Sequence, residues 1–492
     1  MTRRARAALA IASACLAGCA PFNAKLAAVD PARPGYRLAR LQPGQPPDAR
    51  DRLFVVVTLS GGGTRAAAFA YGALEGLRDL RVPVDGRIVS LLGEVDVVSS
   101  VSGGSFAAAY YGAFGPDAFF ARFQTDVLNR RLESGIALRV LAPWNWPRLL
   151  SPYYSRTDLA VAYYDSTIFQ HRAYSELPDR PLIVLNATDL SAGAPFAFLQ
   201  DAFDALCSDL EPLPLATAVA ASSAFPVAFP PLTLRNWNAD GDCGYAPSRA
   251  IDNAIAGGPE LNAHDYERAK ERRSFTDPAR RYLHLSDGGI ADNLGLRGVL
   301  AGIVSGVPDL PLLQRVNLDR IDRLVVISVD AKPGVSTKKD AHRGAPGLFT
   351  VMSRAASAPM GNYSTDSVAW LKSAIEGDAT QVNDLLARRA ACDGLFAGKE
   401  ERDDCYERFA AGGDRLPHCF DFYGVHVQFE NAPAETQERL KDIDTRLQLP
   451  RKDVKLLIEE GRRQVGESKE LARLLRDLER PEDFPCPSAP DE

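Results

Sequence analysis

The stretch "RLFVVVTLSGGGTRAAAFAYGALEGLRDL" (residues 52–80) decides the fold class, because a continuous apolar run meets three glycines and then a helix-like segment. Uninterrupted Val, Leu and Phe residues are typical of a strand that is buried on both faces. The same order returns in "VDVVSSVSGGSFAAAYYGAF" (95–114), and further apolar runs follow at 181–190, 281–287 and 322–331. This alternation predicts an α/β fold, a three-layer sandwich with a mostly parallel central sheet and additional C-terminal helices.

The segments on either side of these runs predict the organisation of the chain. Residues 51–335 are expected to form the main domain, with a polar, turn-rich surface excursion at 236–281. Residues 336–480 are expected to form a largely helical extension packed on that domain, and 481–492 a tail. The extension is predicted because apolar residues recur at helical spacing, with Pro450 between two of the segments. These residues are Leu440, Ile443, Leu447, Val454, Leu457, Ile458, Leu471, Leu474, Leu475 and Leu478.

The N-terminus has the pattern of an export signal. Three arginines, at positions 3, 4 and 6, precede an apolar run that is too short to cross a bilayer. The run ends in "LAGC" (16–19), which resembles the bacterial lipoprotein cleavage box, so residues 1–18 would be removed and Cys19 acylated. Residues 19–50, rich in Pro, Ala and Arg, would then form a tether. Because Ala20 carries no acidic retention signal, the resemblance implies a lipid anchor in the cell envelope, at the outer membrane, facing either side. An ordinary signal peptide with a chance cysteine is the alternative.

Composition excludes some function classes. Removing residues 1–18 would change the formal net charge from −6 to −9, and so acidic a chain lacks the basic surface that nucleic-acid binding needs. Of the eight cysteines, Cys207 and Cys243 flank one block, which favours a local disulfide pair in an oxidising compartment. Four others, Cys392, Cys405, Cys419 and Cys486, form a C-terminal cluster. Metal binding is the rival interpretation, but no C-x-x-C or paired-histidine spacing is present, so neither a metal nor a cofactor is expected.

The glycine loop is a candidate anion site. Gly61, Gly62 and Gly63 lie where a strand gives way to a helix, and the N–H groups of a helix N-terminus attract negative charge. No G-K-[ST] follows, which disfavours a P-loop. Gly61, Gly63 and Ala66 do satisfy the G-x-G-x-x-G/A pattern of dinucleotide sites, but the next predicted strand runs into Ser102 instead of ending in the required acid.

The second strand-to-helix turn places Ser102 directly before Gly103 and Gly104. A nucleophile elbow requires this arrangement, because a tight turn lifts the hydroxyl above the sheet and small neighbours avoid clashes with the following helix. A Ser/Gly-rich turn that only caps a helix is the other interpretation. Oxyanion donors could come from the glycine loop, Gly61 to Gly63.

A serine nucleophile needs a base, and none of the six histidines stands in a recognisable triad context. His284 precedes Asp287 by three residues on a predicted strand, so their side chains would point to opposite faces, and His284 is expected to be a packed side chain. Asp287 ends that strand before Gly288 and Gly289, which makes it the better candidate. Its site would have to desolvate it, since an aspartate with the ordinary pKa of about 3.9 is a weak base.

Together the three segments resemble the patatin-like phospholipases, over about residues 50–330 and more weakly in the C-terminal helices. "VLNATDLSAGAPFAF", "ATAVAASSAFPVAFPPL" and "SDGGIADNLGL" extend the likeness beyond the motifs. The resemblance implies a Ser-Asp dyad of Ser102 and Asp287, Gly61 to Gly63 as oxyanion donors and Arg65 as a supporting cation. Gly104, beside the elbow, and Gly288 and Gly289, which leave room for a substrate, are expected to support the site. The chain departs from the G-x-S-x-G pattern at Ser100.

The resemblance implies a hydrolase of fatty acyl esters in membrane lipids, with Cys19 as the membrane anchor. A lipid-binding envelope protein without turnover, and an acyltransferase with the same dyad, remain alternatives. The stretch "LRVLAPWNWPRLLSPYYSR" (138–156) mixes aromatic residues with arginines, so it predicts either a lipid interface or a buried helix and loop.

Overall fold

The computed structural model describes residues 22–29, 35–37, 53–84, 86–241, 243–297, 322–332 and 421–480, with five isolated positions between 343 and 402. The expected signal peptide, Cys19, the four C-terminal cysteines and the tail lie outside the described residues. None of the helices in these ranges is both long and apolar enough to cross a bilayer.

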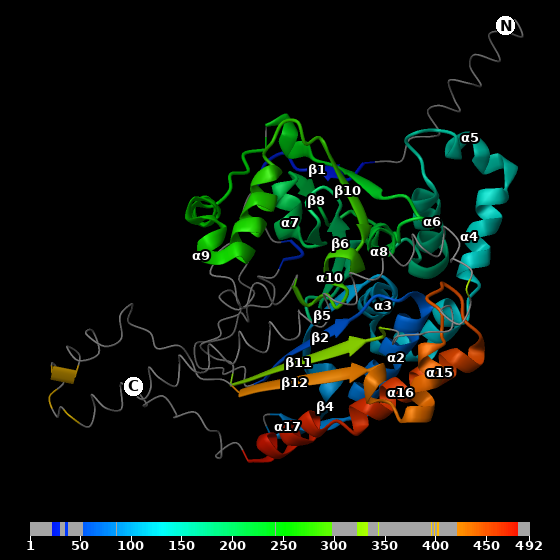
Figure 1. Ribbon diagram of the computed structural model, residues 1–492, viewed down its shortest axis with the longest axis vertical. Helices are drawn as coiled ribbons and strands as arrows, with labels where there is room; N and C mark the ends of the chain where they lie inside the picture. The colour runs from blue at the N-terminus through cyan, green and yellow to red at the C-terminus, as the bar shows by residue number, and fades with distance from the viewer. Residues whose placement is uncertain are drawn as a thin grey trace, which may run out of the picture.

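An eight-stranded sheet forms the centre of the molecule (Figure 1). Five parallel strands lie in the order β12 (Asp421–Gln428), β11 (Arg323–Asp330), β2 (Leu53–Leu59), β5 (Val95–Val101) and β6 (Leu182–Asp189). Antiparallel β10 (Tyr282–Asp287) and β9 (Leu232–Arg235) continue the sheet, and β7 (Ala194–Ala197) pairs with β6. The strands β2, β5 and β6 are buried along their whole length, as their apolar runs predicted.

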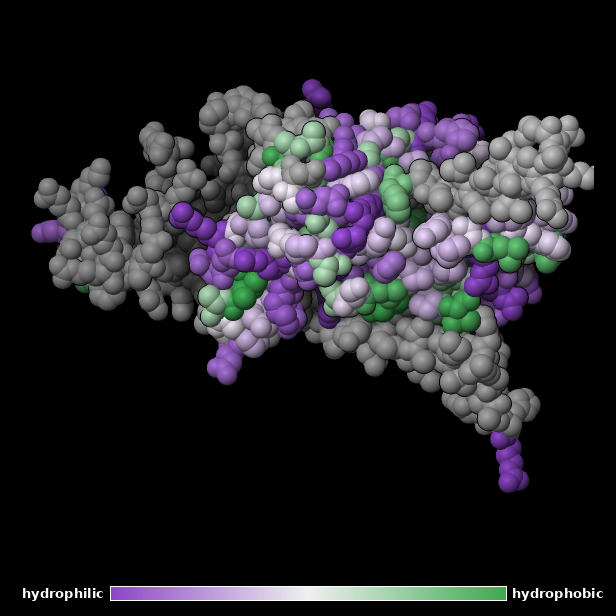
Figure 2. Space-filling view, turned by 90° about the horizontal axis from the view of Figure 1, so that it is seen from above, coloured by the Kyte–Doolittle hydropathy of each residue, from purple (hydrophilic) through white to green (hydrophobic). Residues whose placement is uncertain are grey.

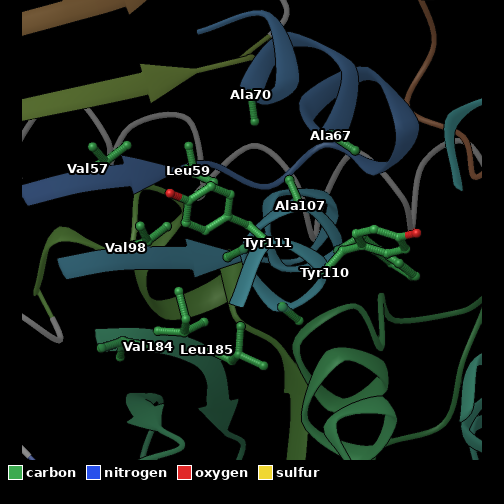
Figure 3. Close-up of a cluster of buried hydrophobic side chains, with 14 of the residues drawn as sticks. Val57, Leu59, Ala67, Ala70, Val98, Ala107, Tyr110, Tyr111, Val184 and Leu185 are labelled. Atoms are coloured by element: carbon green, nitrogen blue, oxygen red, sulfur yellow. The ribbon is translucent and has the colours of Figure 1, made fainter. Parts of the chain in front are cut away.

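Helices follow the strands as predicted. Helix α2 (Gly63–Asp79) follows β2, α3 (Gly103–Phe123) follows β5, and a hairpin of β3 (Arg81–Val84) and β4 (Arg87–Ser90) precedes β5. In the core, Tyr111 of α3 points toward the sheet, where Val98 of β5 lies, whereas Tyr110 points away from the sheet (Figure 3). The fold is a three-layer α/β sandwich with a mixed, mostly parallel sheet and C-terminal helices, as the sequence predicted.

The remaining elements surround this core. They are β1 (Ala24–Lys25), η2 (Leu91–Glu94), η3 (Gln124–Leu128), α4 (Leu132–Leu141), η4 (Pro143–Asn145), α5 (Trp146–Leu149), α6 (Arg156–Tyr164), η5 (Asp165–Phe169), η6 (Tyr174–Glu176), α7 (Gln200–Ala205), β8 (Ser208–Asp209), α8 (Leu215–Ser222), η7 (Trp237–Asp240), α9 (Arg249–Ser274), α10 (Gly289–Asp292), η9 (Phe429–Asn431), α15 (Ala434–Lys441), α16 (Arg451–Gly466) and α17 (Lys469–Glu479).

The C-terminal region is more than a helical extension. Helices α15, α16 and α17 lie within the segment where helical spacing was predicted, although α15 ends at Lys441, so Ile443 and Leu447 lie in the following loop. Strand β12 joins the central sheet in full register with β11. The sequence did not predict this strand. Helix α16 packs directly on α2, with Gly72 against the backbone of Ile458 and Gly461 against the backbone of Phe69. The C-terminal region therefore completes both the sheet and the layer that holds α2.

Two other expectations need correction. The segment 236–281 is not mainly turns, because it contains α9, whose chain bends at Gly258 (φ 71°) before Pro259. The expected tether packs on the domain where it is described: Tyr36 is fully buried, and the Arg37 guanidinium forms an ion pair with Asp204 at 2.5 Å. The predicted local disulfide is present between Cys207 and Cys243, with Cα atoms 5.9 Å apart.

Candidate active site

Ser102 lies in a strained turn between β5 and α3. Its backbone has φ 48° and ψ −114°, a combination that non-glycine residues rarely adopt. Neighbouring segments come so close that only glycine fits at the two positions after Ser102. A Cβ on Gly103 would overlap the backbone of Gly63, and one on Gly104 would overlap the Leu59 carbonyl. The turn therefore has the backbone geometry that a nucleophile elbow requires.

Asp287 reaches Ser102 across β6. Strands β5 and β10 pair with opposite edges of β6, so Val101 lies beside Asn186 while Asp287 lies beside Ala187. The Ser102 hydroxyl donates a hydrogen bond to Asp287 Oδ2 at 2.8 Å, although the residues are 185 positions apart in sequence. Both side chains are buried.

The environment of Asp287 prepares it to accept a proton. Burial raises the pKa of its carboxyl group to about 6, against smaller opposing effects of the hydrogen bonds from Ser102 and from the Gly289 N–H. Its backbone is fixed as well, because its N–H donates to the Ala224 carbonyl and its carbonyl accepts from Thr188 Oγ1. A carboxyl group with this pKa is ionised at neutral pH yet more basic than an exposed aspartate.

The glycine loop lies beside Ser102. Gly62 (φ 140°) and Gly63 (φ 62°) both occupy backbone conformations that favour glycine, and Gly63 begins α2. The Gly61 N–H donates to the Asn293 carbonyl at 3.1 Å, so the expectation that all three glycines supply free donors is wrong for Gly61. Within the described part of the chain, no acceptor is recorded for the N–H groups of Gly62 and Gly63.

Residues 57–300 match the sequence model of a protein family, the patatin-like phospholipases. This range includes the glycine loop, Ser102 and Asp287. The chain belongs to the patatin-like phospholipase family. No curated protein matches the chain. Family membership gives the protein a hydrolase role in lipid metabolism.

In this family member Arg65 connects three segments. Its buried guanidinium donates from Nε to the Ala331 carbonyl at 3.0 Å, just after β11, and from Nη1 to the Ile443 carbonyl at 2.8 Å, after α15. The Thr64 N–H donates to the Arg446 carbonyl at 2.8 Å in the same C-terminal loop. The C-terminal region therefore holds the start of α2, and with it the glycine loop, in place.

The departure from the patatin-like pattern at Ser100 is accommodated. The Ser100 hydroxyl is buried and donates to the Val184 carbonyl at 3.2 Å, with Ser105 Oγ at the same distance. A hydroxyl that has its hydrogen bonds costs little in the core, so this turn forms without the usual glycine.

Gly288 is required near Asp287, because a Cβ at this position would overlap the Asn186 carbonyl.

Sequence reasoning did not single out Ser222, which organises the elbow. Its hydroxyl accepts the Ser102 N–H at 2.8 Å and donates to the Asn186 carbonyl at 2.6 Å. The Ser105 hydroxyl lies 2.9 Å away. Ser222 ends α8 within the segment "ATAVAASSAFPVAFPPL", so the family likeness marked the region but no motif marked the residue.

The histidines lie apart from the dyad wherever the structure describes their side chains. His284 is exposed instead of packed, and its Nδ1 lies 3.0 Å from Thr233 Oγ1. His171 is exposed and pairs with Asp165. Across the described residues, no hydrogen bond joins a histidine to Ser102 or Asp287, and no cluster of potential metal ligands is found.

Proposed function

We propose that the protein hydrolyses fatty acyl esters of membrane lipids with Ser102 as nucleophile and Asp287 as general base. The observation that carries the proposal is the 2.8 Å hydrogen bond between Ser102 Oγ and Asp287 Oδ2 at a strained strand-to-helix turn. A hydroxyl on such a turn is presented to substrate, and an acceptor at this distance can take its proton.

The reaction divides into two steps. Ser102 Oγ forms a bond to the acyl carbon while its proton passes to Asp287, and the N–H groups of Gly62 and Gly63 stabilise the oxyanion. Collapse breaks the ester C–O bond, and the alcohol leaves with the proton from Asp287. Water then attacks the acyl-enzyme and gives a proton to Asp287. Collapse breaks the bond between the acyl carbon and Ser102 Oγ, which takes the proton back from Asp287, and the fatty acid is released.

We also propose that acylated Cys19 anchors the protein to the bacterial outer membrane. The order of arginines, apolar run and "LAGC" supports this location, and more than one acyl chain would make the attachment stable. Metabolic labelling with a palmitate analogue tests it: labelling should disappear in Cys19→Ser, and a Cys19→Ser chain that is still labelled would contradict the proposal.

Fatty acid release from mixed phospholipid vesicles tests the reaction. The chain from Ala20 onward, which retains every described residue, is compared with Ser102→Ala and Asp287→Asn. Both variants should lose at least about 1,000-fold in kcat while remaining folded, as a cooperative thermal transition shows. Asp117→Asn, an exposed aspartate on α3, is the matched control and should keep full activity. A Ser102→Ala variant with the parent rate would overturn the dyad, and binding without turnover in the parent would favour a lipid-binding or acyl-transferring protein.

A further inference from the structure

The α4–α5 arm, residues 132–153, exposes an unusual set of apolar side chains. Figure 2 shows strongly hydrophobic surface at the right-hand end of the molecule, where α4 and α5 lie in Figure 1. Six of the eleven exposed large hydrophobic side chains of the described residues belong to this arm. They are Leu138, Leu141, Trp144, Trp146, Leu150 and Tyr153, with Trp144 79% and Leu150 85% exposed.

The arm is held in place from its inner side, so this exposure is part of the fold. Leu132 and Ile136 of α4 are buried. The Arg139 guanidinium lies 4.0 Å from the centre of the Tyr163 ring, and the Asn145 side chain donates to the Arg139 carbonyl at 2.8 Å. One face of the arm therefore belongs to the domain, and the other presents leucine and tryptophan to the surroundings.

Charge around the arm points to an anionic partner. Residues 130–156 contain five arginines and one glutamate, a local charge of +4 in a chain whose formal net charge is −6. Arg131, Arg148 and Arg156 are exposed. Tryptophan with arginine is the combination that favours the interfacial region of a bilayer, and each cation near an anionic lipid surface contributes about 1 kcal/mol. A second copy of the chain is a poorer partner, because a symmetric contact would place two segments of formal charge +4 against each other.

The arm is also connected to the site. Ser134 Oγ on α4 lies 3.3 Å from Gln448 Oε1, in the same loop whose Arg446 carbonyl binds the Thr64 N–H beside the glycine loop. After the arm, Thr157 on α6 donates to the Pro230 carbonyl, and α6 packs against α8, which carries Ser222. The arm is therefore joined, through one loop and through α6, to elements that position the glycine loop and Ser102.

We infer that the α4–α5 arm binds anionic phospholipid membranes by inserting its tryptophans and leucines among the lipid head groups, with the arginines on the lipid phosphates. The purpose of this contact rests on the proposed function, since it would hold the Ser102 site against its substrate surface. The binding itself does not depend on turnover, and the two are therefore tested separately.

Vesicle flotation in a Ser102→Ala background measures binding without hydrolysis. The chain from Ala20 onward should float with vesicles of 70% phosphatidylcholine and 30% phosphatidylglycerol, and less with pure phosphatidylcholine. Trp144→Ala with Trp146→Ala should weaken binding about tenfold or more. Arg131→Gln with Arg148→Gln should reduce only the part of the binding that depends on phosphatidylglycerol and salt. Ile88→Ala, an exposed apolar residue outside the arm, is the matched control and should bind like the parent.

The same tryptophan pair is then tested in the chain with Ser102 intact. Release of fatty acid from the anionic vesicles should fall about as much as binding, while hydrolysis of a soluble short-chain ester should stay within twofold of the parent. Unchanged flotation of the tryptophan pair, or an equal loss for Ile88→Ala, would overturn the inference. A dimer in solution that the tryptophan substitutions convert to a monomer, with vesicle binding unchanged, would assign the arm to a second copy and also overturn it. If flotation depends on the arm but no ester is cleaved, the proposed function fails and the docking surface stands.

Discussion

At the scale of single residues, Asp287 determines how activity depends on pH. Its carboxyl group must be ionised to accept the Ser102 proton, and burial raises its pKa to about 6. Below that pH the value of kcat/KM should fall about tenfold per unit. Rates on a soluble short-chain ester between pH 4 and 8 measure this, with unfolding followed in parallel to exclude acid denaturation. An acid limb with its midpoint near 4 would contradict the buried base.

The same raised pKa predicts that Asp287 lowers stability at neutral pH. The folded state binds the proton more tightly than the unfolded state, whose pKa is near 3.8, so stability decreases as pH rises from about 4 to 6. Asp287→Asn removes the buried ionised carboxylate, and with it this loss of stability, and the amide can keep hydrogen bonds to Ser102 and Gly289. The variant should be more stable than the parent by roughly 1–3 kcal/mol at pH 8, with little of that gain left below pH 4. Urea unfolding at both pH values measures the difference, and an equal difference at both would contradict the linkage.

Ser222 is predicted to position the nucleophile without touching substrate. Ser222→Ala removes the acceptor of the Ser102 N–H, so kcat should fall roughly 10- to 100-fold while KM changes little. Ser223→Ala is the matched control, since this neighbouring buried hydroxyl donates to the Val219 carbonyl of α8 at 2.7 Å and, among the described residues, forms no hydrogen bond with Ser102. Initial rates over a range of concentrations of a soluble ester give kcat and KM separately. An equal loss of kcat in Ser222→Ala and Ser223→Ala would show that Ser222 contributes only to packing.

At the scale of elements, the close contact between α2 and α16 depends on Gly72. A Cβ there would overlap the backbone of Ile458, which cannot rotate away, so α16 would have to move. Gly72→Ala should lower the free energy of unfolding by about 1–3 kcal/mol. Gly466→Ala is the control, because its Cβ would meet no atom within 4 Å, and it should be neutral or slightly stabilising. Chemical denaturation of both variants checks the contrast, and a neutral Gly72→Ala would show that the helices can separate freely.

Elements with strong local signals were predictable from sequence, and those that depend on distant partners were not. The apolar runs of β2 and β5 and the glycines after them identified both strand-to-helix turns, and with them Ser102. Strand β12 reads "DFYGVHVQ", which carries no comparable run, and its pairing with β11 joins segments about 90 residues apart. The Gly61 N–H is occupied by Asn293, a contact that no local pattern encodes.

At the scale of the whole molecule, the family likeness covers less than the folding unit. The match ends at residue 300, yet β12 closes one edge of the sheet and the loop after α15 binds Thr64 and Arg65 at the start of α2. From sequence, Ser102 and Asp287 were separate candidates, and only the family resemblance paired them, whereas the structure shows that Val101 and Asp287 lie on opposite edges of β6. The supporting C-terminal contacts could not be predicted, because main-chain carbonyls leave no signature in side-chain patterns.

A chain that ends after residue 420 should therefore fail to fold, although it retains the entire matched range. Loss of the segment after residue 420 removes β12 and so exposes the edge of β11. It also removes the carbonyls of Ile443 and Arg446, which accept from the buried Arg65 guanidinium and from the Thr64 N–H. The Arg65 guanidinium would keep its bond to the Ala331 carbonyl, but each buried donor that loses its acceptor costs about 1–3 kcal/mol, a large part of the total stability of a domain. Removal of only residues 481–492 is the control, because that tail lies outside the elements named here, and it should leave yield and activity unchanged. Soluble yield, the thermal transition and ester hydrolysis of the two truncated chains test this prediction. A chain ending at residue 420 that stays soluble with more than about a tenth of the activity would contradict it. Such a result would show that the strand and helices after residue 420 only stabilise a site that forms without them.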